Sequence, residues 1–260
     1  MPVLWYGYVP QSLWYHGPFA LRKVRARPNM NFSRSLIAGL LVLVISAAAA
    51  PLAHADKGTV THLSGVLSAK KPDGTIRVLA ERSEVASGEV VTSERNTYAN
   101  IRFADGGQMT LKPASSVRIE KFAYQQDKPQ EDSFVISLLT GGLRLVTGVV
   151  GARSRAKFQV GTQTATIGIR GTTFNIDDCV GGGEGCEGRD AGIYVGVSNG
   201  AVELSNAEGR LVLQAGQFSR VARGLAPRPV ANPGFLFTPP PSFLRSASSG
   251  PRPSECVVRR

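Results

Sequence analysis

Apolar residues recur at every second position along much of the chain between Thr59 and Val221. The alternation is clearest in five segments: Asn100–Phe103, Gln108–Lys112, Val117–Glu120, Phe158–Val160 and Phe174–Ile176. A period of two puts apolar side chains on one face of a strand and polar side chains on the other. These segments are therefore predicted to be half-buried strands. No stretch between residues 56 and 221 has the period of a helix of three or more turns.

Short glycine-containing signals interrupt the alternation. They are Pro72-Asp73-Gly74, Asp105-Gly106-Gly107, Gly141-Gly142, Asn199-Gly200 and Glu208-Gly209. Glycine tolerates the positive φ angles of tight hairpins, so each signal is predicted to be a hairpin turn. Many short, mostly antiparallel strands imply an all-β fold, as a sandwich, a roll or a short solenoid. Residues 65–78 and 200–213 are weakly similar to each other, which leaves open a fold of two lobes. Chance similarity among hairpins explains this likeness as well.

Residues 30–55 have the three parts of a secretory signal peptide. Arg34 supplies the positive charge, residues 36–45 form the apolar segment, and Ala53 and Ala55 form the small-residue cleavage site. The mature chain is expected to begin at Asp56 and to be periplasmic or secreted, with no membrane span. An uncleaved N-terminal anchor is the alternative. Residues 1–29 are interpreted as an N-terminal extension or a misassigned start.

The remaining chain divides by composition. Residues 56–223 carry the strand pattern and are predicted to form the folded β-domain. Residues 224–260 are rich in proline, which has no backbone N–H to donate and a fixed φ. This tail is predicted to be largely disordered.

Charge argues against a nucleic-acid partner. The chain carries a net charge of +11, but none of the 19 acidic residues precedes Asp56, whereas five of the 30 basic ones do. The mature balance is 25 minus 19, or +6. Both tryptophans, Trp5 and Trp14, also precede Asp56, so the mature chain has no tryptophan on which nucleic-acid bases could stack. We expect no nucleic-acid binding.

Three cysteines follow the expected cleavage site. Cys179 and Cys186 are separated by a flexible, glycine-rich stretch, so in an oxidising compartment they are predicted to form a disulfide. Cys256 is then left over, as a free thiol or an intermolecular link.

Two motifs typical of catalysis or cofactor binding occur in the chain, but the sequence around each lacks what its chemistry requires. Residues 196–200 match G-x-S-x-G around Ser198, but a strand continues beyond them and His62, the only mature histidine, precedes the serine. A hairpin turn is the expectation there. Residues 183–188 spell G-x-G-x-x-G without a following helix, which indicates a flexible loop. We therefore expect no catalytic residue and no cofactor, and we expect that the chain is not an enzyme.

The same loop is rich in acids whose oxygens could hold Ca²⁺: Asp177, Asp178, Glu184, Glu187 and Asp190. Their spacing matches no known calcium loop. We expect no metal site.

Residues 99–113 and 158–176, followed by 200–204 and 213–217, resemble the FecR domain family, periplasmic β-domains best known from iron-citrate regulatory systems. The resemblance covers about Thr59 to Val221. It implies structural roles for six motif residues: Asp105, Gly106, Arg170, Gly171, Thr172 and Phe174. The first two are expected to form a hairpin turn, the next three a bend, and Phe174 to re-enter the core. Arg170 either pins the bend through local carbonyls or contacts a partner carboxylate.

The resemblance suggests a stand-alone exported FecR domain. The leading interpretation is a non-catalytic module that binds an envelope protein or a cell-wall polymer through a strand edge or the Cys179–Cys186 loop. The alternative is a periplasmic signalling accessory related to iron uptake and sigma-factor regulation. The sequence leaves the oligomeric state open.

Overall fold

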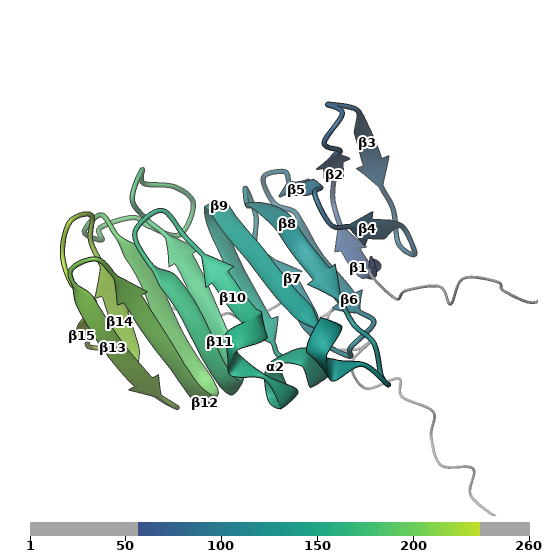
Figure 1. Ribbon diagram of the computed structural model, residues 1–260. Coiled ribbons are helices and arrows are strands. Elements are labelled where there is room, and N and C mark those ends of the chain that lie inside the picture. The colour runs from purple at the N-terminus through teal and green to yellow at the C-terminus, as the bar shows by residue number, and fades with distance from the viewer. Residues whose placement is uncertain (1–56, 235–260) are drawn as a thin grey trace, which may run out of the picture. The chain divides into compact units, whose positions relative to one another are not determined.

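Strands make up most of residues 57–234, the part of the chain that the computed structural model describes, apart from the side chain of Arg170 (Figure 1). The strands are β1 (Lys57–Ser64), β2 (Leu67–Lys70), β3 (Ile76–Leu79), β4 (Glu84–Ala86), β5 (Val90–Ser93), β6 (Tyr98–Phe103), β7 (Gln108–Leu111), β8 (Ser116–Ala123), β9 (Ser133–Val146), β10 (Phe158–Gly161), β11 (Thr166–Asp178), β12 (Ile193–Asn206), β13 (Gly209–Gln214), β14 (Phe218–Val221) and β15 (Arg228–Val230). The prediction of an all-β fold is confirmed.

Helical structure in these residues is limited to three short elements. They are η1 (Pro129–Glu131), α2 (Val149–Arg153) and η2 (Arg155–Lys157). None of the helices found between residues 57 and 234 has the length and apolar character needed to cross a membrane.

The long strands β9, β11 and β12 change neighbours part-way along their length. The first part of β9 pairs with β8 and β10, whereas residues 141–146 pair with β7 and β11. Residues 166–168 of β11 pair with β10, and residues 173–178 pair with β9. In β12, residues 193–196 pair with β14 and residues 201–206 with β13. The three strands therefore each belong to two layers of a sandwich.

We call these layers A and B. Layer A has the order β15-β14-β12-β11-β9-β7-β6-β1-β4. Layer B has the order β13-β12-β11-β10-β9-β8-β5-β2-β3. The β9–β10 pair is parallel and the others are antiparallel. All the described strands fall in one unit of the chain, residues 53–260, so they show no division into two lobes.

Each shared strand bends at a glycine of positive φ: Gly141 (81°), Gly171 (56°) or Gly200 (77°). The inward positions change parity there. In β9, Phe134 and Ile136 are buried before the bend, and Leu143 and Leu145 after it. A bend of this kind lets a strand turn from one layer to the next while its apolar side chains keep facing the core. The predicted hairpin turns at Gly141-Gly142 and Asn199-Gly200 are wrong, because both pairs lie inside continuous strands.

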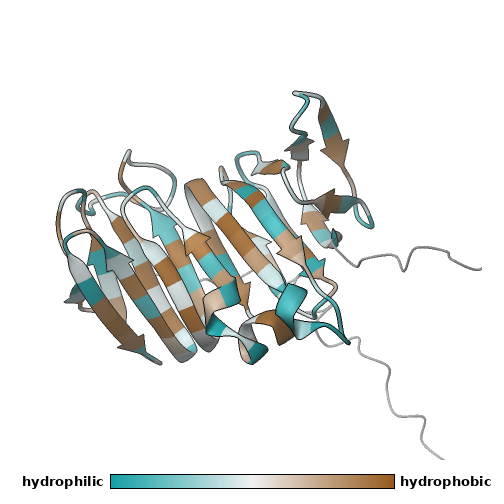
Figure 2. Cartoon of the chain, viewed as in Figure 1, coloured by the Kyte–Doolittle hydropathy of each residue, from teal (hydrophilic) through white to brown (hydrophobic). Residues whose placement is uncertain are grey.

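The core between the layers is a single cluster of buried side chains drawn from both of them. Four phenylalanines meet within it, and the rings of Phe134 and Phe158 stack with their centroids 4.5 Å apart. Apolar and polar bands alternate along the strands in Figure 2, as the period of two predicts.

The sheet continues past the expected domain end at residue 223, because β15 pairs with β14 along the edge of layer A. Pro229 lies in this edge strand, where a missing N–H costs the sheet little. The expected signal peptide with Ala53 and Ala55, most of the proline-rich tail, and Cys256 lie outside the described residues.

Candidate functional site

The loop between β11 and β12 is closed by a disulfide between Cys179 and Cys186, whose Cα atoms lie 5.5 Å apart. The predicted disulfide is thereby confirmed. Both cysteines pack against Tyr194 of β12 in a small buried cluster separate from the main core. The Tyr194 hydroxyl donates a hydrogen bond to the Asp190 carbonyl at 3.0 Å. The disulfide therefore holds the loop against the outer face of layer A.

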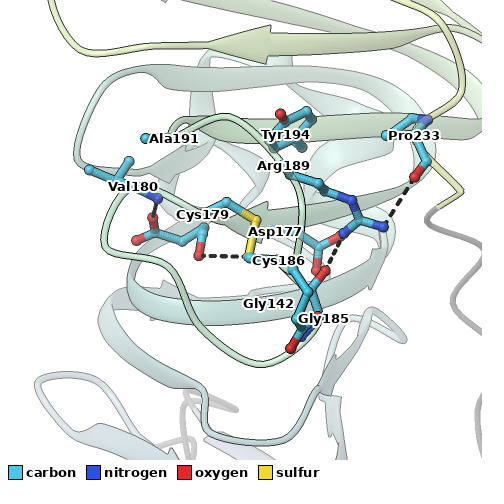
Figure 3. Close-up of a disulfide and its surroundings, with 12 residues drawn as sticks. Gly142, Asp177, Cys179, Val180, Gly185, Cys186, Arg189, Ala191, Tyr194 and Pro233 are labelled. Atoms are coloured by element: carbon cyan, nitrogen blue, oxygen red, sulfur yellow. Dashed lines mark hydrogen bonds between the residues drawn. A yellow bond between two sulfur atoms is a disulfide. The ribbon is translucent and has the colours of Figure 1, made fainter.

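Two arginines fasten the rest of this loop. Arg189 donates to the Gly185 carbonyl within the loop and to the Pro233 carbonyl at 3.1 Å (Figure 3). Arg220 of β14 forms an ion pair with Asp190 at 2.9 Å and donates to the Ala191 carbonyl. The loop that was predicted to be flexible is thus tied to β14 and to the segment after β15.

A buried ion pair lies beside the disulfide. The Lys112 ammonium is 2.5 Å from the Asp177 carboxylate, and the two side chains meet across Gly142 of β9. A Cβ atom on Gly142 would come 2.4 Å from the carboxylate oxygen, so only glycine leaves room for the pair. Burial raises the pKa of the Asp177 carboxyl, and Lys112 opposes the rise.

Asp178 also has a structural role. Its carboxylate accepts hydrogen bonds from the Val180 N–H at 2.9 Å and from the Gln163 side chain at 3.1 Å. Burial raises the pKa of the Asp178 carboxyl despite these bonds. In residues 57–234, no three His, Cys, Asp or Glu side chains come together as a metal site.

A polar row crosses the outer face of layer A next to this loop. Cross-strand register places Arg144 between Thr110 of β7 and Asn175 of β11, and Asn100 of β6 opposite Thr110. Thr61 joins the row through the hydrogen bond of its hydroxyl to Asn100. Sequence reasoning missed the row, because its members are far apart in the chain and become neighbours only through strand pairing. The only local signal was that four of them, Asn100, Thr110, Arg144 and Asn175, are each polar between two buried apolar residues.

Asp105 does more than form the turn between β6 and β7. Its side chain is 3% exposed and accepts hydrogen bonds from the N–H of Gly107 at 3.0 Å and of Val150 at 3.2 Å. Gly106 has a φ of 83° and completes the turn. Burial raises the pKa of the Asp105 carboxyl, while these hydrogen bonds act to lower it. Asp105 thus joins the hairpin to the start of α2, a link that the sequence did not reveal.

The remaining motif residues lie at the bend of β11. The backbone N–H of Thr172 bonds the Thr147 hydroxyl at 2.8 Å, and the Thr172 hydroxyl donates to the Ala201 carbonyl at 3.2 Å. Phe174 is fully buried in the core. The backbone of Arg170 pairs with Ala201 of β12, and its side chain lies outside the described part of the structure.

The catalytic pair considered for Ser198 is not assembled. Ser198 is exposed on β12, and His62 lies on β1, with β11, β9, β7 and β6 between them in layer A. At about 4.8 Å per strand this separation is roughly 24 Å, too far for proton transfer between the two side chains.

No curated protein matches the chain. Two crystal structures of a candidate anti-sigma factor from Parabacteroides distasonis ATCC 8503 are similar to it, at 16% and 15% identity, with TM-scores of 0.42 and 0.41. In both, the similarity covers 55% of this chain and 59% of the other. The chain thus spans less than two thirds of that solved relative.

A family model described as FecR protein matches residues 88–203. The match runs from the start of β5 through most of β12, and includes all six motif residues and the disulfide loop. It leaves out β1 to β4, of which β1 and β2 pair directly with matched strands. The resemblance to the FecR family is therefore confirmed over residues 88–203.

Proposed function

We propose that the chain is a signalling accessory of the bacterial cell envelope, which binds a protein of a regulatory system related to iron uptake and sigma-factor control. The FecR-family match over residues 88–203 is the observation that carries the proposal. It favours this function over a general envelope scaffold, which the sequence first suggested, because the family is best known from regulatory systems.

An exposed sheet edge in layer B supports protein binding. Among the strands of residues 57–234, edge strand β3 pairs only with β2, and its outward side chains Ile76 and Val78 are 66% and 75% exposed. Arg77 between them turns inward and pairs with Glu89 at 2.9 Å. A strand edge with free backbone groups and apolar side chains can accept a strand from a partner protein.

Export is part of the proposal. The signal-peptide pattern of residues 30–55 supports it, and so does the Cys179–Cys186 disulfide, since disulfides persist mainly in oxidising compartments. Cell fractionation with thiol labelling tests this point. A protein found in the cytoplasm with both thiols free would contradict it.

The signalling role is tested by deleting the gene and measuring transcripts. We expect a restricted regulon to change, and wild-type protein to restore it. Complementation with the Ile76→Lys, Val78→Lys variant should fail, whereas Val212→Lys, on edge strand β13 at the other end of layer B, should restore the regulon. An unchanged transcriptome together with a disturbed envelope would favour the scaffold instead.

A further inference from the structure

Arg144 is a half-buried cation at the centre of the polar row on layer A. Within residues 57–234 its side chain makes neither an ion pair nor a hydrogen bond, in contrast to Lys112, which is paired with Asp177 one row away. Burial lowers the pKa of the Arg144 guanidinium, although an arginine stays protonated at neutral pH. A partly desolvated guanidinium is satisfied best by a carboxylate, which can accept two parallel N–H bonds.

The hydrogen bonds of the neighbouring side chains leave a second donor, the Thr110 hydroxyl, beside Arg144. The Thr61 hydroxyl donates to the Asn100 Oδ1 at 2.7 Å, and the Asn100 Nδ2 donates to the Thr110 Oγ1 at 2.8 Å. The Thr110 oxygen is thus already an acceptor, and its hydroxyl proton donates to no residue of the described chain. Thr110 lies directly opposite Arg144 across β7 and β9, so this proton is available beside the guanidinium.

Asn175 completes the site from the other side. It lies opposite Arg144 across β9 and β11, and its Oδ1 atom is buried without a hydrogen-bond partner among the described residues. A buried amide oxygen without a donor costs free energy, so a ligand that supplies an N–H is favoured there. The row therefore offers donors for a carboxylate and, one strand further, an acceptor for an N–H.

We propose that Arg144, Thr110 and Asn175 form a binding site for an acidic side chain of a partner protein, with the carboxylate on Arg144 and Thr110 and a backbone N–H of the same segment on Asn175. This inference rests on the proposed function and names the chemistry of its partner. A peptide fits better than an acidic polysaccharide, because residues 57–234 contain no tryptophan to stack on sugar rings.

The test is an NMR titration of the purified chain with the blocked peptide acetyl-Ala-Glu-Ala-amide, following the side-chain signals of Arg144 and Asn175. The matched ligands are the same peptide with Gln in place of Glu, and a trimer of galacturonic acid. The protein variants are Arg144→Gln, Arg144→Lys, which keeps the charge without the planar fork, and Asn175→Ala. Arg118→Gln, which removes an exposed arginine of layer B, is the charge-matched control.

We expect saturable shifts with the Glu peptide and none with the Gln peptide. Arg144→Gln should weaken binding about tenfold or more, Arg144→Lys and Asn175→Ala less, and Arg118→Gln should leave it unchanged. Equal weakening by Arg118→Gln, tighter binding of the sugar acid, or no shifts with the Glu peptide would each overturn the site. None of these results would alter the transcript measurement, so the site and the signalling role can fail separately.

Discussion

The carboxylate of Asp105 accepts a hydrogen bond from the N–H of Val150, 45 residues further along the chain. One oxygen holds the turn of the β6–β7 hairpin and the other holds the start of α2. The Asp105 carbonyl also accepts the Val149 N–H at 3.0 Å. A single turn residue therefore fixes the connection that carries the chain out of β9.

Replacing Asp105 by alanine should destabilise the protein by about 1–3 kcal/mol, because two buried N–H groups would lose their acceptor. Urea denaturation monitored by circular dichroism measures the change. Asp73→Ala is the control, since Asp73 forms a similar Asp-Gly turn that is fully exposed. Equal effects of the two substitutions would show that the link to α2 contributes nothing.

Gly142 and Gly168 are a second matched pair. A Cβ atom would meet the Asp177 oxygen at 2.4 Å in Gly142→Ala, whereas the nearest atom in Gly168→Ala is 4.0 Å away. We expect Gly142→Ala to cost about 1–3 kcal/mol by displacing the Lys112–Asp177 pair, and Gly168→Ala to be nearly neutral. Thermal unfolding compares them. Similar melting temperatures for the two variants would contradict the proposed crowding.

Removal of the disulfide should lower the free energy of unfolding by about 2 kcal/mol, given a sequence separation of 7 between Cys179 and Cys186. Denaturation of the Cys179→Ser, Cys186→Ser variant measures the loss. Reductant should destabilise the wild type by a similar amount and leave this variant unchanged. A wild type that is indifferent to reductant would mean that Arg189 and Arg220 hold the loop without the disulfide.

The stability should also depend on pH through Asp178. Burial raises the pKa of this carboxyl in the folded state above its ordinary value of 3.8. The folded state then binds the proton more tightly than the unfolded state. The contribution of Asp178 to stability therefore falls as pH rises from the ordinary pKa to the raised pKa of the folded state. The wild type should therefore be more stable relative to Asp178→Asn below pH 3.8 than at neutral pH, as a larger difference in the free energy of unfolding. The opposite trend in denaturation curves would show that the hydrogen bonds from Val180 and Gln163 outweigh burial.

Local alternation was enough to predict strands such as Asn100–Phe103 and Phe174–Ile176, because half-buried strands impose that pattern directly. It could not separate a hairpin turn from a bend inside a strand, since glycine at positive φ serves both. The distinguishing signal was the change of parity, from Phe134 and Ile136 to Leu143 and Leu145, which only makes sense once the core is known.

The candidate sites were predictable to different degrees. The Cys179–Cys186 disulfide was readable because its residues are close in sequence and joined by glycines. The environment of Arg144 was not, because it depends on the pairing of β7, β9 and β11, whose register is set by contacts between distant segments. The contact between Asp105 and Val150 was hidden for the same reason.

The passage of β9, β11 and β12 through both layers has a consequence for how the domain comes apart. Neither layer can unfold while the other stays folded, because β9, β11 and β12 form backbone hydrogen bonds in both layers. Denaturation should accordingly be one cooperative event, and the amides slowest to exchange with deuterium should be spread over both sides of the bends.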